Sequence, residues 1–187
     1  MKNLVVKTAL ITLIAVLSVA IITFALLTAF APGVMYKVTS GLGMDKTALS
    51  FAVRYYEKTE DISDLREVVY LASETEDYDR LAKYSKELIY HDDFSTFASS
   101  QPDGYVEYVM TSYVFALVES GNTNTVSETF KLYDDFYSEY VANNPIYCLI
   151  RFTDSYDSLI EQKLNSLLEN ENDNNLLKQD LAKVKTR

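Results

Sequence analysis

The chain has 187 residues and a net charge of −10 at pH 7, with 27 acidic and 17 basic side chains. Such an acidic surface repels phosphate groups, so the composition argues against nucleic-acid binding. A single cysteine, Cys148, excludes an internal disulfide bond and any metal site built from several cysteines.

The N-terminal part contains one long apolar segment. No charged residue occurs from Thr8 to Tyr36, and about 20 helical residues are enough to cross the hydrocarbon of a bilayer. The Pro-Gly pair at 32–33 is expected to end this apolar helix. We therefore expect a short N-terminal tail at 1–7, a transmembrane helix (signal anchor) at 8–31, a linker at 32–43 and an α-helical hairpin domain at 44–187.

A cleaved signal peptide is the competing interpretation of the apolar segment. Lys2 and Lys7 form a basic start, and the Ala-Phe-Ala sequence at 29–31 resembles a cleavage site. The apolar run is, however, far longer than the roughly 7–15 residues of a signal-peptide core. Cleavage after 31 would also place Pro32 first in the mature chain. We therefore expect the segment to remain attached as an anchor.

The charges around the anchor indicate its orientation. Lys2 and Lys7 precede the apolar run, while Lys37 and Lys46 follow it, so the positive-inside rule gives only a small bias. A short tail that carries two lysines is nevertheless the harder side to translocate. We therefore expect a single-pass membrane protein with its N-terminus inside the cytoplasm and its C-terminal domain outside.

Helical periodicity recurs through the rest of the chain, and no stretch alternates convincingly as a strand. Leu49, Ala52 and Tyr56, for example, follow the i, i+3, i+7 spacing of one helix face. These patterns predict an all-α fold with helices near 45–58, 62–74, 78–90, 104–119, 125–141, 145–168 and 174–184, and a short helical turn around 93–98.

Helix start signals precede several of these segments. Asp61 and Asp77 are placed to accept hydrogen bonds from the free backbone N–H groups of the helices that follow. The sequence Thr-Val-Ser-Glu at 125–128 has the spacing of a capping box. Asn144 followed by Pro145 predicts a further helix start.

Two segments resemble the second helix of a tetratricopeptide repeat. The sequence A-V-R-Y-Y-E-K at 52–58 is similar to the pattern A-x-x-Y-Y-E-K, and D-Y-D-R-L at 77–81 is similar to the D-Y-x-x-A entry into the same helix. Gly121-Asn122 before a capped helix is a looser third match. Tyr55 and Tyr84 lie 29 residues apart, against about 34 in that repeat, and its W-x-x-L-G signature is missing. The resemblance covers roughly residues 43–140 and implies helical hairpins that bind other proteins through a concave surface.

No residue pattern in the chain demands a particular chemistry. His91, Asp92 and Asp93 are consecutive and do not converge on one ion. The polar run at 169–175 lacks the glycine of a calcium loop, and no glycine-rich phosphate loop is present. We therefore expect no catalytic residues, no metal and no cofactor, and we expect that the protein is not an enzyme.

One stretch favours partner binding. Between Glu87 and Ile150 the chain has ten acidic residues and one basic residue, Lys131. Acidic groups attract a basic partner, and tyrosines at the rim of a surface are good binding anchors. These features predict a partner-binding surface formed by Phe130, Tyr133, Asp134, Asp135, Phe136, Tyr137 and Tyr140.

We therefore expect a membrane-anchored, non-enzymatic scaffold or adaptor that holds a protein or peptide, which could be basic, near the membrane surface. The lipid bilayer would be contacted through residues 8–31. Two alternatives stay open: an enzyme or small-ligand receptor whose site is assembled only in three dimensions, and a purely structural subunit of a membrane complex.

Overall fold

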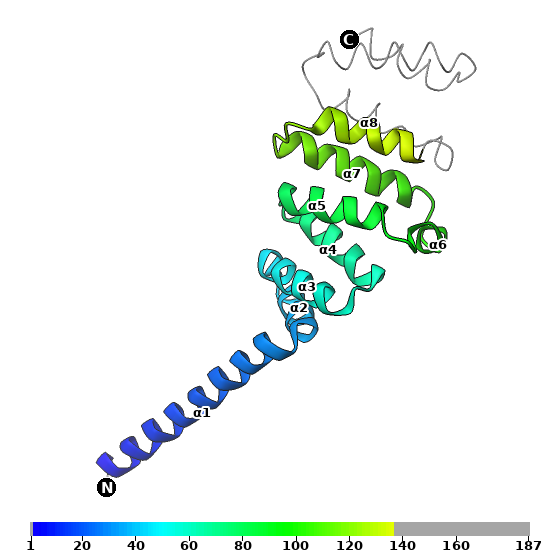
Figure 1. Cartoon of the computed structure of the whole chain (residues 1–187). Helices are drawn as coiled ribbons and strands as arrows, with labels where there is room; N and C mark the ends of the chain where they lie inside the picture. The colour runs from blue at the N-terminus through cyan, green and yellow to red at the C-terminus, as the bar shows by residue number, and fades with distance from the viewer. Residues whose placement is uncertain (1, 137–187) are drawn as a thin grey trace, which may run out of the picture. The chain divides into compact units, whose positions relative to one another are not determined.

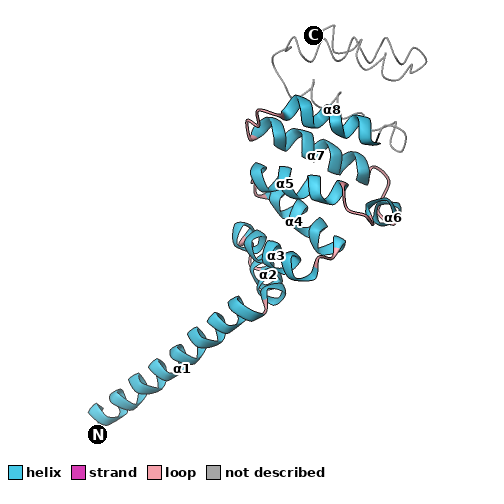
Figure 2. Cartoon of the chain, viewed as in Figure 1, coloured by secondary structure: helices cyan, strands magenta, loops and turns pink. Residues whose placement is uncertain are grey.

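The protein is all-helical over residues 2–136, the part that its computed structural model describes (Figures 1 and 2). This part contains eight helices and no strand, which confirms the all-α class. The chain divides into two compact units, one up to Thr75 and the other from Glu76 onward. The segment expected to form one domain at 44–187 therefore contains parts of both units.

The helix boundaries agree closely with those predicted from the sequence. The helices after the N-terminal region are α3 (Asp45–Thr59), α4 (Ile62–Glu74), α5 (Tyr78–Ile89), α6 (Phe94–Ser99), α7 (Tyr105–Glu119) and α8, described as Thr125–Phe136. The N-caps at Asp61 and Asp77 are confirmed, since their side chains accept the backbone N–H groups of Ser63 at 2.8 Å and of Arg80 at 3.2 Å. The helices predicted at 145–168 and 174–184, and the start at Asn144-Pro145, lie outside the described residues.

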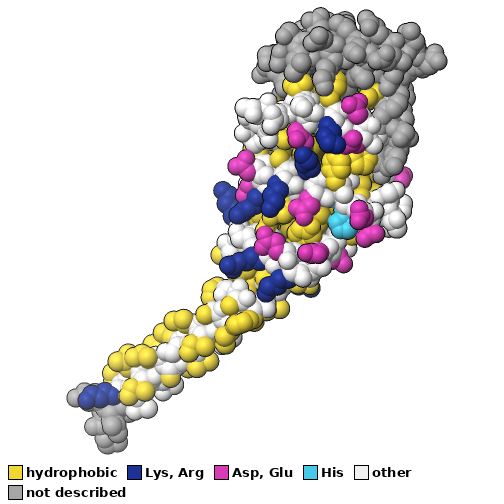
Figure 3. Space-filling view, viewed as in Figure 1, with side chains coloured by type: hydrophobic (Ala, Val, Ile, Leu, Met, Phe, Trp, Pro, Cys, Tyr) yellow, Lys and Arg dark blue, Asp and Glu magenta, His cyan; other side chains and the backbone are white. Residues whose placement is uncertain are grey.

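Helix α1 (Lys2–Phe30) is the one helix of the described part that is long and apolar enough to cross a membrane. Its Val6–Phe30 stretch has 25 residues and a mean hydropathy of 2.9, and none of its most apolar part is buried. At about 1.5 Å per residue, this stretch is about 38 Å long, against about 30 Å of bilayer hydrocarbon. Hydrophobic side chains cover it along its length (Figure 3).

Three hydroxyl side chains within α1 donate hydrogen bonds to the backbone of the same helix. The bonds run from Thr12 to the Thr8 carbonyl at 3.0 Å, from Ser18 to the Ile14 carbonyl at 2.8 Å and from Thr28 to the Ala25 carbonyl at 2.8 Å. Because these three hydroxyls are already paired, they add little polarity to an apolar helix surface.

The segment at 32–43 differs from the expected linker because most of it is helix α2 (Pro32–Gly41). The proline ends α1 as expected, but it also occupies the first turn of the next helix, where its missing N–H costs nothing. Met35 and Thr39 are buried, and α2 packs against α3. Within the first unit, the helices that pack against one another therefore begin at Pro32.

A close approach between α2 and α3 explains the glycine at position 33. A Cβ atom added to Gly33 would lie 2.7 Å from a ring carbon of Tyr55 on α3. Tyr55 belongs to the segment that resembles a tetratricopeptide repeat. The contact shows that this tyrosine packs against the helix directly after α1.

A hydrogen bond joins α2 to α4 in the same unit. The Tyr36 hydroxyl donates to Glu67 Oε2 at 3.0 Å. Burial, together with this carboxylate, raises the pKa of Tyr36 to about 12. With α3 packed on both α2 and α4, the three helices form the folded part of the first unit.

In the second unit, α7 packs against both α5 and α8. Helix α7 buries much of its surface, including Val109, Tyr113, Val114 and Leu117. It begins after Gly104, whose positive φ of 85° suits a glycine. This central helix carries the side chains of the candidate site.

The capping box expected at 125–128 does not form. The Thr125 hydroxyl instead donates toward the carbonyls of Leu117 at 3.0 Å and Asn122 at 2.6 Å. Glu128 accepts hydrogen bonds from α5 and α7. The spacing was correct for a capping box, but tertiary partners occupy both side chains.

Candidate functional site

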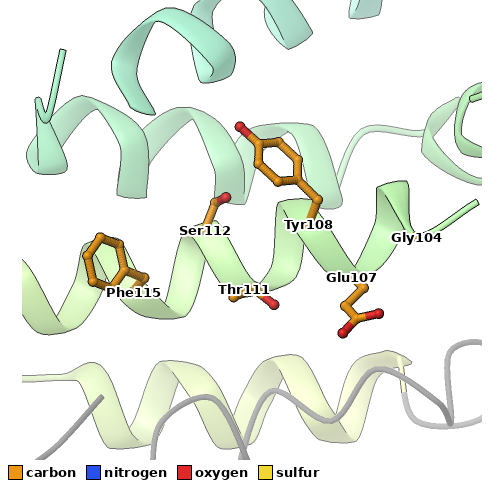
Figure 4. A pocket seen from close by; sticks show the side chains of 6 residues that line it. All are labelled: Gly104, Glu107, Tyr108, Thr111, Ser112 and Phe115. Atoms are coloured by element: carbon orange, nitrogen blue, oxygen red, sulfur yellow. The ribbon is translucent and has the colours of Figure 1, made fainter. Parts of the chain in front are cut away.

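A groove of about 520 Å³ runs along one side of α7 in the second unit. Its lining residues, which repeat at the spacing of helix turns, are Gly104, Glu107, Tyr108, Thr111, Ser112 and Phe115. Figure 4 shows them along successive turns, with the Tyr108 ring and the Glu107 carboxylate pointing away from each other at the two edges of this face. The groove is thus a surface feature of one helix face.

The groove combines aromatic surface with one negative charge. Tyr108 is 42% exposed, and Glu107 beside it is exposed as well. The half-buried Phe115 meets the ring of Tyr78 edge to face, with 5.6 Å between centroids. Aromatic side chains offer a large contact area at low entropic cost, and the carboxylate can pair with a base. The lining thus consists of two aromatic rings, two hydroxyl side chains, one carboxylate and a glycine.

A polar cluster ties α5, α7 and α8 together. Glu128 Oε2 on α8 accepts Lys86 Nζ of α5 at 2.6 Å and the Tyr113 hydroxyl of α7 at 2.9 Å. The bond from Lys86, aided by that from Tyr113, holds the pKa of Glu128 below its usual value. Burial and the adjacent Glu128 carboxylate raise the pKa of Tyr113 well above its usual value.

A second cluster joins Tyr90, directly after α5, to Asp135 and Phe136 on α8. Asp135 Oδ2 accepts the Tyr90 hydroxyl at 2.6 Å and also bonds Lys131. The Tyr90 ring packs edge to face against Phe136 at 5.2 Å, with Lys131 Nζ 5.2 Å from the Tyr90 centroid. Chiefly because of the bond from Lys131, the pKa of Asp135 lies below its usual value.

The pKa of Glu128 gives a testable pH dependence. A carboxyl whose pKa is lower in the folded chain stabilises it above the unfolded pKa of 4.5 and loses this effect as the pH falls through the folded value. Glu128→Gln is therefore expected to be less stable than the native protein at neutral pH, with the difference narrowing below about pH 4.5. Thermal unfolding followed by circular dichroism at several pH values measures this difference.

Tyr113→Phe serves as the control for this experiment because it removes one of the two hydrogen bonds and keeps the carboxyl. Its pH dependence is expected to lie between those of the native protein and Glu128→Gln. A Glu128→Gln difference that stays constant from neutral to acid pH would show that the carboxylate does not stabilise the fold through its charge.

The structure separates the residues predicted as one partner-binding surface. Phe130 and Tyr133 are buried, with exposures of 3% and 4%, so they belong to the core. Asp134 and Asp135 are exposed, and Phe136 is half-buried against Tyr90. Tyr137 and Tyr140 lie outside the described residues. The prediction from the sequence thus agrees with the structure for the exposed Asp134 and Asp135. It also assigned Phe130 and Tyr133 to the surface, and these two residues lie in the core.

The groove residues were not predicted as a site. The apolar stripe of α7 consists of its buried side, formed by Val109, Met110, Tyr113, Ala116 and Leu117, and of the half-buried Val106. Tyr108 and Phe115 lie off this stripe, seven residues apart, and they share another face of the same helix. Two aromatic residues at this spacing on the side opposite a core stripe are a signal that could have found the groove.

The described residues contain no group of three or more His, Cys, Asp or Glu side chains that could hold a metal ion. His91 Nδ1 and Asp93 Oδ2 are 4.0 Å apart at the end of α5, and Asp93 is largely exposed. Residues 2–136 therefore combine one membrane-length apolar helix with helical units that carry a groove suited to binding. Comparisons with protein-family models, with curated proteins and with solved structures give no match.

Proposed function

We propose that the protein is a membrane-anchored, non-enzymatic adaptor that holds a partner protein or peptide near the membrane surface. The observation that carries this proposal is the groove along α7, which joins an aromatic, largely apolar lining to the exposed carboxylate of Glu107. The resemblance of two segments to tetratricopeptide repeats supports a protein-binding role. It leaves the partner unspecified.

The groove chemistry favours a particular kind of ligand. Its length from Gly104 to Phe115 corresponds to about 16 Å along the helix, enough for three turns of a partner helix or a short extended segment. Helix α7 contains Glu107 and Glu119 and no basic residue. A segment with a large apolar side chain for Tyr108 and a Lys or Arg for Glu107 therefore fits the groove.

The anchor is the second part of the proposal. The apolar stretch Val6–Phe30 exceeds the length needed to cross a bilayer, and its polar side chains at 12, 18 and 28 are bonded to its own backbone. The lysines at 2 and 7 favour an inside N-terminus, which would place the helical units outside the cytoplasm.

Photo-crosslinking in native membranes tests the proposal. A benzoylphenylalanine replaces Tyr108 in the full-length protein, and the matched control replaces Tyr70, an α4 tyrosine with a similar exposure of 51%. A discrete protein product at position 108 that is missing at position 70 is the expected result. Equal products at both positions, or none at 108, would contradict binding in the groove.

Kinetics with the crosslinked partner then separate the two contributions of the groove. Tyr108→Ala is expected to speed dissociation about tenfold or more, because a central aromatic anchor contributes about 2 kcal/mol. Glu107→Gln is expected to slow association and flatten its salt dependence, with little effect on dissociation. Tyr70→Ala should leave both rates unchanged. If Tyr108→Ala has no effect, the partner binds elsewhere on the protein.

A further inference from the structure

Large aliphatic side chains are exposed at one place in the described chain after α1. From residue 45 to the end of the described part, the exposed large hydrophobic residues are all tyrosines, namely Tyr70, Tyr90 and Tyr108. The exposed aliphatic residues lie within 34–44 and are Val34 at 49%, Val38 at 49%, Leu42 at 69% and Met44 at 49%. The rest of the described helical part thus covers its large aliphatic side chains, whereas the segment next to α1 does not.

Helix α2 leaves part of its apolar surface exposed. Met35 and Thr39 are buried, whereas Val34 and Val38 lie on a neighbouring face, on average about 100° around the helix. Leu42 extends this face beyond the last turn. An apolar helix surface is normally covered across its whole width, so the exposed part requires a second apolar phase.

The charges of this segment match an anionic lipid surface. The chain has a net charge of −10, yet its first acidic residue is Asp45, after α2 has ended. The one charged residue of α2 is Lys37, which is exposed between Val34 and Val38. Acidic and basic side chains are spread over the later helices, whereas α1 is covered by hydrophobic ones (Figure 3). Lysine beside aliphatic side chains is typical of helices that lie in the headgroup layer.

The position of α2 in the chain places it at the bilayer. A single residue, Ala31, separates the end of α1 from Pro32 at the start of α2. Val34 follows Phe30 by four residues, which even a fully extended chain spans in about 14 Å. Phe30 is itself 77% exposed and ends the apolar stretch. The outer face of α2 therefore begins where the hydrocarbon ends.

We propose that α2 is an interfacial helix, with Val34, Val38 and Leu42 in the headgroup layer of the bilayer and Lys37 at the lipid phosphates. This inference rests on the proposed anchoring by α1 and extends it, because lipid contact continues into the first folded unit. One face of α2 then packs against α3 and the other against lipid. The acidic helices that follow remain outside the lipid, where anionic headgroups repel them.

Single-tryptophan variants test this arrangement directly because the chain contains no tryptophan. Val38→Trp reports on the outer face of α2, and Leu17→Trp reports on the middle of α1. Tyr70→Trp is the water-exposed reference, since Tyr70 is 51% exposed and Glu67 and Glu74 flank it on α4. The full-length protein is placed in vesicles of equal parts phosphatidylcholine and phosphatidylglycerol. Part of the phosphatidylcholine is brominated, either close to the headgroup or deep in the acyl chain.

We expect shallow bromines to quench about half of the Val38→Trp emission and deep bromines to quench Leu17→Trp, with Tyr70→Trp quenched by neither. In addition, Lys37→Glu should reduce the shallow quenching of Val38→Trp in these anionic vesicles, and it should have less effect in pure phosphatidylcholine.

The other outcomes overturn the inference in distinguishable ways. If Leu17→Trp is quenched by deep bromines but Val38→Trp emits as in water, α1 spans the bilayer and α2 lies away from it. A blue-shifted Val38→Trp that no bromine quenches would mean that a protein surface, such as a second copy of this chain, covers α2. If neither Trp is quenched, the proposed anchoring itself fails.

Discussion

Val109→Asp is expected to unfold the second unit while the first unit remains folded. Val109 has no exposed surface and lies on the side of α7 that forms the core. An unpaired carboxylate there would lose its hydration without gaining a partner, which costs about 3–5 kcal/mol, a large part of the stability of a domain of this size. The substitution also removes the two methyl groups of Val109 from the core, which adds to this cost.

The effect should depend on pH in a defined direction. Burial raises the pKa of a carboxyl group, so the folded chain binds a proton more tightly than the unfolded one. The introduced group therefore costs least at acid pH, where it is neutral in both states, and most at neutral pH. Val109→Asn, which has a similar shape and no charge, should lack this pH dependence and cost less.

Hydrogen exchange read by mass spectrometry measures this prediction because it reports on each helix separately. In Val109→Asp, peptides from α5, α7 and α8 should lose protection, while those from α3 and α4 keep it. Val118→Asp, at a half-buried position of the same helix, should have a smaller effect. Full protection of α7 in Val109→Asp would mean that this side chain does not contribute to the core.

A chain that begins at Gly43 is expected to lose protection throughout the first unit, whereas one that begins at Pro32 keeps it. The shorter chain lacks α2, which packs against α3 and provides Tyr36 as a hydrogen-bond donor to Glu67. The buried Met35 alone accounts for about 2 kcal/mol of apolar burial. Loss of the whole helix should therefore destabilise α3 and α4 by several kcal/mol.

The comparison of the two truncated chains contains its own control. Both lack α1, so any effect of removing the apolar helix is shared, and α5 to α8 should exchange at the same rate in both. Met35→Ala in the longer chain should produce part of the loss. Equal protection of α3 in the two chains would show that α2 is dispensable and that 32–43 behaves as a linker after all.

The contrast between α2 and the later helices shows what the sequence could predict. Helices such as α4 were located within one or two residues because a stripe of Leu65, Val68, Val69 and Ala72 follows a capping Asp61. Both signals are local. Helix α2 has only ten residues, includes two glycines and begins after Ala31 without a side-chain cap, so neither signal marks it clearly.

The candidate site depended more strongly on tertiary structure. An aromatic residue at helical spacing fits a core and a binding face equally well, and only packing placed Phe130 and Tyr133 inside and left Tyr108 exposed. Glu128 illustrates the same limit. Its distance from Thr125 predicted a capping box, but its partner Lys86 lies 42 residues away in the chain. Periodicity does not reveal such a partner.

The junction between α1 and α2 also determines how far the first unit can move from its anchor. A flexible stretch with the twelve residues of 32–43 would let its two ends separate by about 20 Å on average and in any direction. Here one residue, Ala31, joins two helices, and α2 is held to α3 by the contact of Gly33 with Tyr55. With α1 in the bilayer as proposed, this one-residue connection keeps α2 and the helices packed on it in a thin layer next to the lipid. A partner confined to the same layer would meet it at a far higher effective concentration than one in bulk solution.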